Sequence, residues 1–136
     1  MALAYDVSIR RSMLDDITTR AGASALLRFY SGSRPATGGT VTTLLAELPC
    51  SATFAPAASG AVNGSPVTLT LNAITTANAV ATGTATWFRI VQSNGTTFVL
   101  DGDVNTSGSD LNMSSTAFVS GQPVAVTSFV ITEGNP

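Results

Sequence analysis

The sequence predicts a mainly β protein, an antiparallel β-sandwich or jelly roll preceded by one short amphipathic helix. Many short runs alternate apolar with hydroxyl-bearing residues, and Gly, Ser and Asn turn signals separate them roughly every 10–20 residues. Only one segment has the spacing of an amphipathic helix. Because 136 residues is an ordinary length for one domain, we expect a helical N-terminal segment over 1–22 and a β-sandwich over 23–136.

The helix is expected over residues 8–21. Asp6 or Ser8 can cap its start, and Gly22 suits the position after its end. Such a helix can cover the end of the protein's own sheet, or it can dock onto a neighbouring subunit, and the sequence leaves both open. The apolar side chains of the helix fall on one stripe, formed by Ile9, Met13, Leu14 and Ile17.

Strands are expected in seven places along the rest of the chain. The run over 67–71 is the clearest, because valine and leucine alternate with threonine there. The last run also alternates but has apolar residues on both faces. The Ala- and Gly-rich stretch 57–65 is expected to be a flexible loop. The expected strands cover residues 25–30, 44–48, 53–55, 67–71, 84–92, 96–100 and 123–132.

A β-hairpin is expected around Asn94-Gly95, because this dipeptide lies between two β-rich runs and favours a two-residue type I′ turn. Apolar residues on both faces of the hairpin place it at the centre of the sandwich, and Arg89 is then expected near an edge or an interface. A two-residue loop would pair Val91 with Phe98, Arg89 with Leu100 and Trp87 with Gly102.

The composition excludes most catalytic chemistry. The chain contains no lysine and no histidine, and charged residues make up 10% of it, against about 25% in an average soluble domain. It therefore lacks the amine and imidazole groups that most proton-transfer and nucleophilic sites use. Glu47 and Glu133 are the only glutamates, and nothing in the sequence places them together. Cys50 is a lone cysteine, expected to be a small buried hydrophobe. We therefore predict no enzyme activity and no cofactor.

The charge is unevenly distributed, with five of the six arginines in residues 1–34. A pI near 4.7 is opposite to what nucleic-acid binding requires, and no apolar run approaches the ~20 residues of a membrane span. Guanidinium groups suit interface carboxylates, so we expect the arginine-rich head to bind an acidic protein surface. The candidate interface residues are Arg10, Arg11, Arg20, Arg28 and Arg34.

One acidic stretch after the hairpin is similar to the start of a calcium loop, because oxygen ligands recur at alternating positions, Asp101, Asp103 and Asn105. An EF-hand loop needs glycine and glutamate where Thr106 and Asn112 stand. The favoured interpretation is therefore an acidic, turn-rich exit from the strand, and no metal is predicted. A structural Ca²⁺ between subunits is the alternative.

Four aromatic residues in the expected strands are interpreted as core, because aromatic side chains in strands usually are. The alternative is an exposed platform on which a sugar could stack. These residues are Phe29, Tyr30, Trp87 and Phe88.

Four strings of sequence have no catalytic signature but together span most of the chain. They are MALAYD at residues 1–6, LRFYSGSRPAT at 27–37, TGTATWFRI at 82–90 and SFVITEGN at 128–135. Together they resemble a family of small virion proteins of tailed bacteriophages.

This resemblance implies a capsid decoration (cement) protein, commonly a jelly roll, that binds the outer shell between major capsid protein subunits and stabilises the head. The implied partners are the major capsid protein and further copies of this chain, as a dimer or trimer, with no nucleic acid and no membrane. The implied location is the capsid surface of the virion, after assembly in the bacterial host cytoplasm. The helix and its arginines would face the capsid.

Two other virion roles remain open at this point. One is a neck, tail or fibre-attachment protein, which would have the same sequence features. The other is a carbohydrate-binding virion module that uses Trp87 or the loops at Asn63 and Asn105.

Overall fold

The computed structural model describes residues 3–133, which contain one helix and are otherwise mainly β, as the sequence predicts. Helix α1 spans Val7–Ala21. The largest sheet, in the order β2-β1-β6-β7-β8, consists of β1 (Leu26–Ser31), β2 (Thr43–Pro49), β6 (Trp87–Val91), β7 (Phe98–Asn105) and β8 (Leu111–Asn112). Three two-stranded sheets pair β3 (Val67–Thr70) with β11 (Val130–Glu133), β4 (Ala77–Asn78) with β10 (Pro123–Val124), and β5 (Gly83–Thr84) with β9 (Ala117–Phe118).

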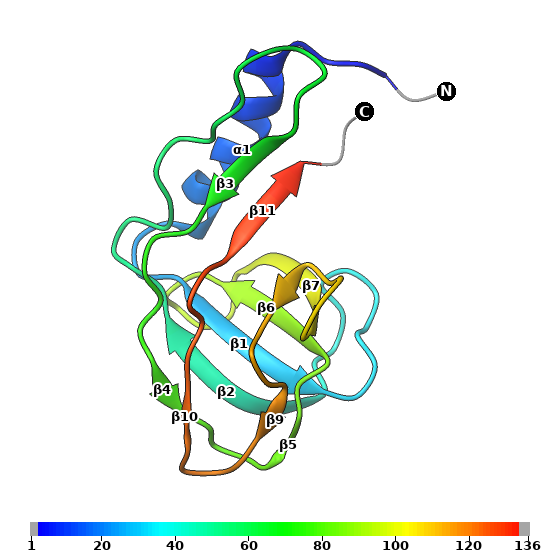
Figure 1. The fold of residues 1–136 in the computed structure, drawn as a ribbon. Coiled ribbons are helices and arrows are strands. Elements are labelled where there is room, and N and C mark those ends of the chain that lie inside the picture. The colour runs from blue at the N-terminus through cyan, green and yellow to red at the C-terminus, as the bar shows by residue number, and fades with distance from the viewer. Residues whose placement is uncertain (1–2, 134–136) are drawn as a thin grey trace.

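The elements are arranged along one long direction (Figure 1). Helix α1 and the β3–β11 ribbon lie together at one end, and the five-stranded sheet occupies the middle. The short pairs β4–β10 and β5–β9 lie at the opposite end. The last segment of the chain runs from β10 at that end to β11 beside α1, so it connects both ends of the molecule.

A jelly roll is not confirmed, because the strands form one large sheet and three small ones, and β7 pairs with β8 in parallel. The expected strand over 53–55 is wrong. Phe54 is buried there, but its carbonyl accepts a single hydrogen bond from the N–H of Asn72 at 3.0 Å instead of joining a ladder. The expected strand over 123–132 is divided into β10 and β11, because the chain changes its pairing partner from β4 to β3.

Helix α1 ends where the sequence predicts and begins one residue earlier than expected, with Asp6 as its N-cap. The carboxylate of Asp6 accepts the N–H of Ser8 at 2.9 Å, and the hydrogen bonds from Ser8 lower the pKa of the Asp6 carboxyl. The helix ends at Gly22, whose φ of +69° favours glycine. No helix within residues 3–133 has the length and apolar character that a membrane span requires.

The buried stripe of α1 differs from the expected one. The helix buries Arg10, Leu14 and Ala21, and these spacings of 4 and 7 residues correspond to one helix face. Ile9 and Met13, which were expected in the stripe, are 50% and 47% exposed. Apolar periodicity alone did not predict which face of the helix is buried, because an arginine occupies one position of that face.

The β6–β7 hairpin has the expected pair Val91 with Phe98, but the remaining register is wrong by one residue. A bulge between Ile90 and Val91 shifts it, so that Arg89 lies opposite Asp101. The bulge places an acid beside the arginine, where the expected register had Leu100.

The turn of this hairpin is not type I′, which requires positive φ at both central residues. Gly95 has a φ of +75°, whereas Asn94 is not among the residues with positive φ. The N–H of Gly95 donates to the carbonyl of Gln92 at 2.9 Å. The Asn94 side chain instead accepts the N–H groups of Thr96 and Thr97, each at 2.9 Å.

Candidate interaction surfaces

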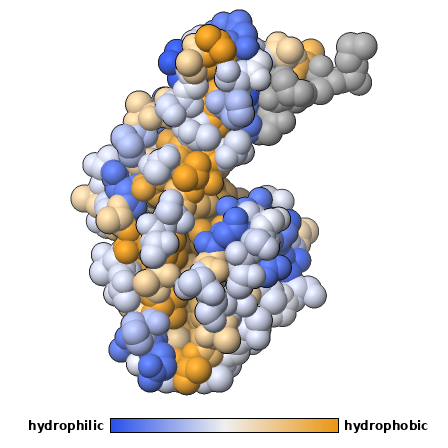
Figure 2. All heavy atoms as spheres, in the orientation of Figure 1, coloured by the Kyte–Doolittle hydropathy of each residue, from blue (hydrophilic) through white to orange (hydrophobic). Residues whose placement is uncertain are grey.

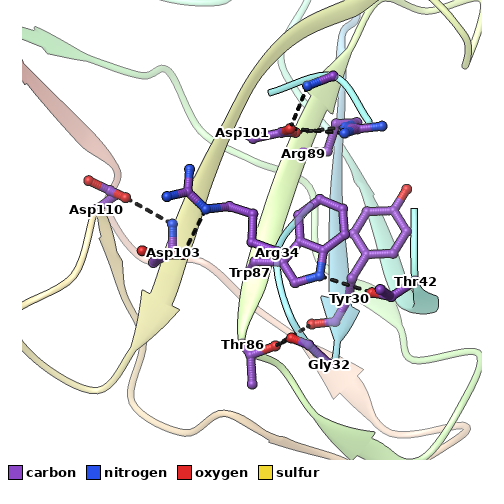
Figure 3. A network of polar contacts seen from close by, with 11 residues as sticks. Tyr30, Gly32, Arg34, Thr42, Thr86, Trp87, Arg89, Asp101, Asp103 and Asp110 are labelled. Atoms are coloured by element: carbon purple, nitrogen blue, oxygen red, sulfur yellow. Dashed lines mark hydrogen bonds and ion pairs between the residues drawn. The ribbon is translucent and has the colours of Figure 1, made fainter. Parts of the chain in front are cut away.

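Arg89 and Asp101 form a buried ion pair between β6 and β7 (Figure 3). The guanidinium donates from Nε to Oδ1 at 2.6 Å and from Nη2 to Oδ2 at 2.9 Å. The two side chains are 9% and 3% exposed. The hydrogen bond to Asp101 raises the pKa of Arg89. The expectation that Arg89 lies near an edge is wrong, because β6 is the central strand of its sheet.

Trp87 packs beside this pair and is completely buried. Its ring stacks on Tyr30, with centroids 4.3 Å apart and an interplanar angle of 14°, and its Nε1–H donates to Oγ1 of Thr42 at 2.9 Å. The guanidinium of Arg89 lies 5.4 Å from the indole centroid. The core interpretation is confirmed, and the sugar-stacking alternative is wrong, for Phe29, Tyr30, Trp87 and Phe88.

The candidate metal ligands are not brought together as a metal site. Asp101 binds Arg89, whereas Asp103 binds Arg34, with Nε 3.0 Å from Oδ1. The side chain of Asn105 accepts the N–H of the next residue at 2.8 Å. Within residues 3–133 no three His, Cys, Asp or Glu residues are grouped so that they could hold a metal ion.

The five candidate arginines lie in different places. Arg28, on β1, pairs with Glu47 at 2.6 Å, and Arg34 lies in the loop after β1. Of the three on α1, Arg10 is buried and its Nε lies 2.7 Å from Glu133. These five arginines are close together in the sequence, but they do not form one surface patch. Arg10 in particular is buried in an ion pair with Glu133.

The outward side of α1 exposes apolar side chains. Ile9, Met13, Asp16 and Arg20 share this side, because 3-, 4- and 7-residue spacings return to the same helix face, and we call them the outer face of α1. Arg11 lies on a different side of the helix, because two residues correspond to a rotation of about 200°. Neither Arg11 nor Arg20 forms an ion pair with the described residues. Leu3, just before the helix, is also largely exposed.

A groove with a volume of about 500 Å³ separates β11 from β7 and β8. Figure 2 shows the hollow between the end that contains α1 and the five-stranded sheet, with hydrophobic residues where the two parts meet. The buried rings of Phe88 and Phe129 line it and meet edge to face, with centroids 5.2 Å apart. Sequence reasoning missed this groove, because residues 109–112 and 129–132 meet only through the tertiary fold.

Cys50 is buried, as expected, and burial raises its pKa from 9.0 to about 11. We therefore expect iodoacetamide to leave the folded protein unmodified at mildly alkaline pH and to alkylate Cys50 after denaturation, as measured by mass spectrometry. The raised pKa keeps the Cys50 thiol protonated in the folded protein. The contribution of this thiol to the free energy of unfolding is complete below pH 9.0 and is lost as the pH rises toward about 11. A Cys50→Ala variant should lack that part of the alkaline decline. Rapid alkylation of folded protein would contradict the burial.

No family model, no curated protein and no solved structure matches the chain.

Proposed function

We propose that the chain is a structural protein of a tailed-bacteriophage virion, which decorates the outside of the head between major capsid protein subunits. The four strings that resemble small virion proteins support this role. The composition supports this role too, because the cores of protein interfaces are depleted in charged residues. Charged residues make up only 10% of this chain. Its action would be mechanical, by adding buried contact area, rather than catalytic.

The main support is the outer face of α1, where Ile9 and Met13 are about half exposed. Apolar side chains flanked by polar residues are typical of a surface that another protein covers. Arg20, on the same side of the helix, can bind a carboxylate of the partner. Arg10 does not belong to this surface, since it is buried against the protein's own β11.

Each copy needs only a standard interface, on the order of 800 Å² per partner. Repetition over a lattice then multiplies the number of contacts that must break before the shell opens. Contacts between copies at a symmetry axis, as a dimer or trimer, are part of the proposal.

Electron cryomicroscopy of the particle tests the location. The proposal expects density of this chain on the outer surface of the head, at contacts between major capsid protein subunits. Density at the neck, tail or fibre would identify a different structural role and contradict the proposal.

Particles that carry Ile9→Asp together with Met13→Asp test the docking face. We expect occupancy to fall at least about tenfold, because central interface residues commonly contribute 2 kcal/mol or more when removed. Arg20→Glu should reduce occupancy less, and more strongly at low salt than at high salt. The matched control is Val119→Asp, an exposed apolar residue near the opposite end of the molecule. Unchanged occupancy of the double variant, or loss only in the control, would contradict the assignment.

A further inference from the structure

The outer edge of β11 presents backbone groups that its own sheet does not use. Leu71 donates its N–H to the carbonyl of Phe129 at 3.0 Å, so the pair 71–129 is a hydrogen-bonded pair of the antiparallel ladder. Hydrogen-bonded and non-hydrogen-bonded pairs alternate. Two pairs of this ladder are therefore non-hydrogen-bonded, Val130 with Thr70 and Thr132 with Thr68. It follows that the N–H and C=O of Val130 and Thr132 point away from β3.

The opposite side of β3 supports the same alternation. Thr68 exchanges two hydrogen bonds with Ser59, each at 2.9 Å, so its backbone groups point away from β11. Proteins often protect an exposed strand edge with lysine, proline or a covering segment. The β11 residues, VITE, include neither lysine nor proline, and β3 is the only strand paired with β11 among the described residues.

This edge lines the groove rather than open solvent. Val130, Ile131 and Thr132 form one wall, and the opposite wall includes Asp110 and Asn112. A volume of about 500 Å³ lies within the roughly 300–1,000 Å³ of typical ligand sites. A second hollow of about 300 Å³ shares residues of both walls, so the groove continues along the chain.

The groove also has a chemical preference. Its floor is apolar, with Phe88 and Phe129. Asp110 is exposed on the wall, and it forms no ion pair within residues 3–133, although one oxygen accepts the N–H of Asp103 at 2.8 Å. A partner that fills the groove therefore gains from an apolar side chain toward the floor and a cation toward Asp110.

We propose that the groove binds an extended, cationic segment of a partner protein, which adds to β11 as a third strand of the β3–β11 sheet. The segment would exchange hydrogen bonds with Val130 and Thr132, as in other cases of strand addition. Its alternate side chains would contact the rings of Phe88 and Phe129. The inference deepens the proposed function by naming the kind of segment a virion partner would supply, but it uses a surface separate from the outer face of α1.

Binding can be measured by NMR with the ¹⁵N-labelled protein and blocked heptapeptides that alternate valine with lysine. We expect shift changes at the amides of Val130, Thr132 and Asp110, and slower hydrogen exchange at Thr132. A peptide that alternates valine with glutamate should bind about two- to fivefold more weakly, since one exposed charge pair is lost. The lysine peptide methylated at its alternate backbone nitrogens should bind about tenfold more weakly, because strand hydrogen bonds are lost.

Substitutions in the protein test the same contacts that the modified peptides test. Thr132→Pro removes only an outward N–H and should weaken binding about tenfold, whereas the control Thr132→Ala should bind like the original protein. Asp110→Asn should abolish the preference for lysine over glutamate. If Thr132→Pro does not fold, the methylated peptide tests the same hydrogen bonds.

Several results would overturn the proposal. Shift changes confined to α1, or equal binding of the methylated and unmethylated peptides, would contradict strand addition. A dimer of the protein alone that Thr132→Pro dissociates would assign the edge to a second copy. Retained particle binding in the outer-face variants, with peptide binding intact, would contradict only the proposed docking face. Loss of peptide binding alone would contradict only this inference.

Discussion

Replacement of Asp101 by alanine is expected to lower the free energy of unfolding by about 3–5 kcal/mol, because it leaves a buried guanidinium without its counter-charge. Arg89 lies in the central strand of the largest sheet, and both its hydrogen bonds to Asp101 are shorter than 3 Å. Gly38 in a distant loop also donates its N–H to Asp101, at 3.2 Å. The substitution therefore removes a hydrogen-bond acceptor from both the hairpin and the loop. Urea denaturation followed by circular dichroism measures the loss.

Two controls separate the buried charge from a general loss of contacts. Asp103→Ala, on the same strand, breaks a pair with Arg34 whose side chains are 52% and 40% exposed, so we expect a loss below about 1 kcal/mol. The double variant Arg89→Met with Asp101→Leu should recover most of the stability, because apolar pairs commonly replace a buried ion pair at little cost. Equal losses for Asp101→Ala and Asp103→Ala would show that burial does not govern the energy of the first pair.

Replacement of Trp87 by alanine is expected to cost about 3–5 kcal/mol, as for other fully buried aromatic residues. The indole stacks on Tyr30, lies under the guanidinium of Arg89 and donates to Thr42. Its removal would leave a cavity between β1 and the loop that precedes β2. Calorimetry measures this loss without relying on tryptophan fluorescence.

Thr42→Val serves as a comparison for Trp87→Ala, because it leaves the ring in place. It removes a hydroxyl that accepts from the indole N–H and also donates to the carbonyl of Ser31. An indole N–H left buried without a partner costs about 1–3 kcal/mol. We therefore expect Thr42→Val to be less stable than the original protein and more stable than Trp87→Ala. A loss for Trp87→Ala no larger than that for Thr42→Val would mean that ring packing contributes little.

Local patterns predicted the elements whose signals lie within a few residues. Asp6 and Gly22 mark the ends of α1 because capping uses adjacent backbone groups. Alternation over 67–71 predicted β3, which contains four of those five residues. The burial of Cys50 and Trp87 was predicted from residue type, because a free cysteine behaves as a small hydrophobe and aromatic side chains in strands usually belong to the core.

Predictions of register and of strand continuity were partly wrong, although the pair of Val91 with Phe98 was predicted correctly. One bulge beside Val91 moved Asp101 opposite Arg89, and no local pattern indicates such an extra residue. The division of 123–132 likewise depends on β4 and β3, which are far away in sequence. The arginines that were grouped by their closeness in sequence were separated in space, with Arg10 buried and Arg28 on β1.

The amino-acid sequence by itself determined that this is a mainly β chain with one capped N-terminal helix, because propensity, capping and alternation act between near neighbours. Only the tertiary structure decided which side chains meet. It joined Asp101 to Arg89, turned Ile9 and Met13 outward, and set the free edge of β11 across a groove from Asp110. Such contacts result from packing over the whole chain, where one shifted residue moves every later side chain to a different neighbour.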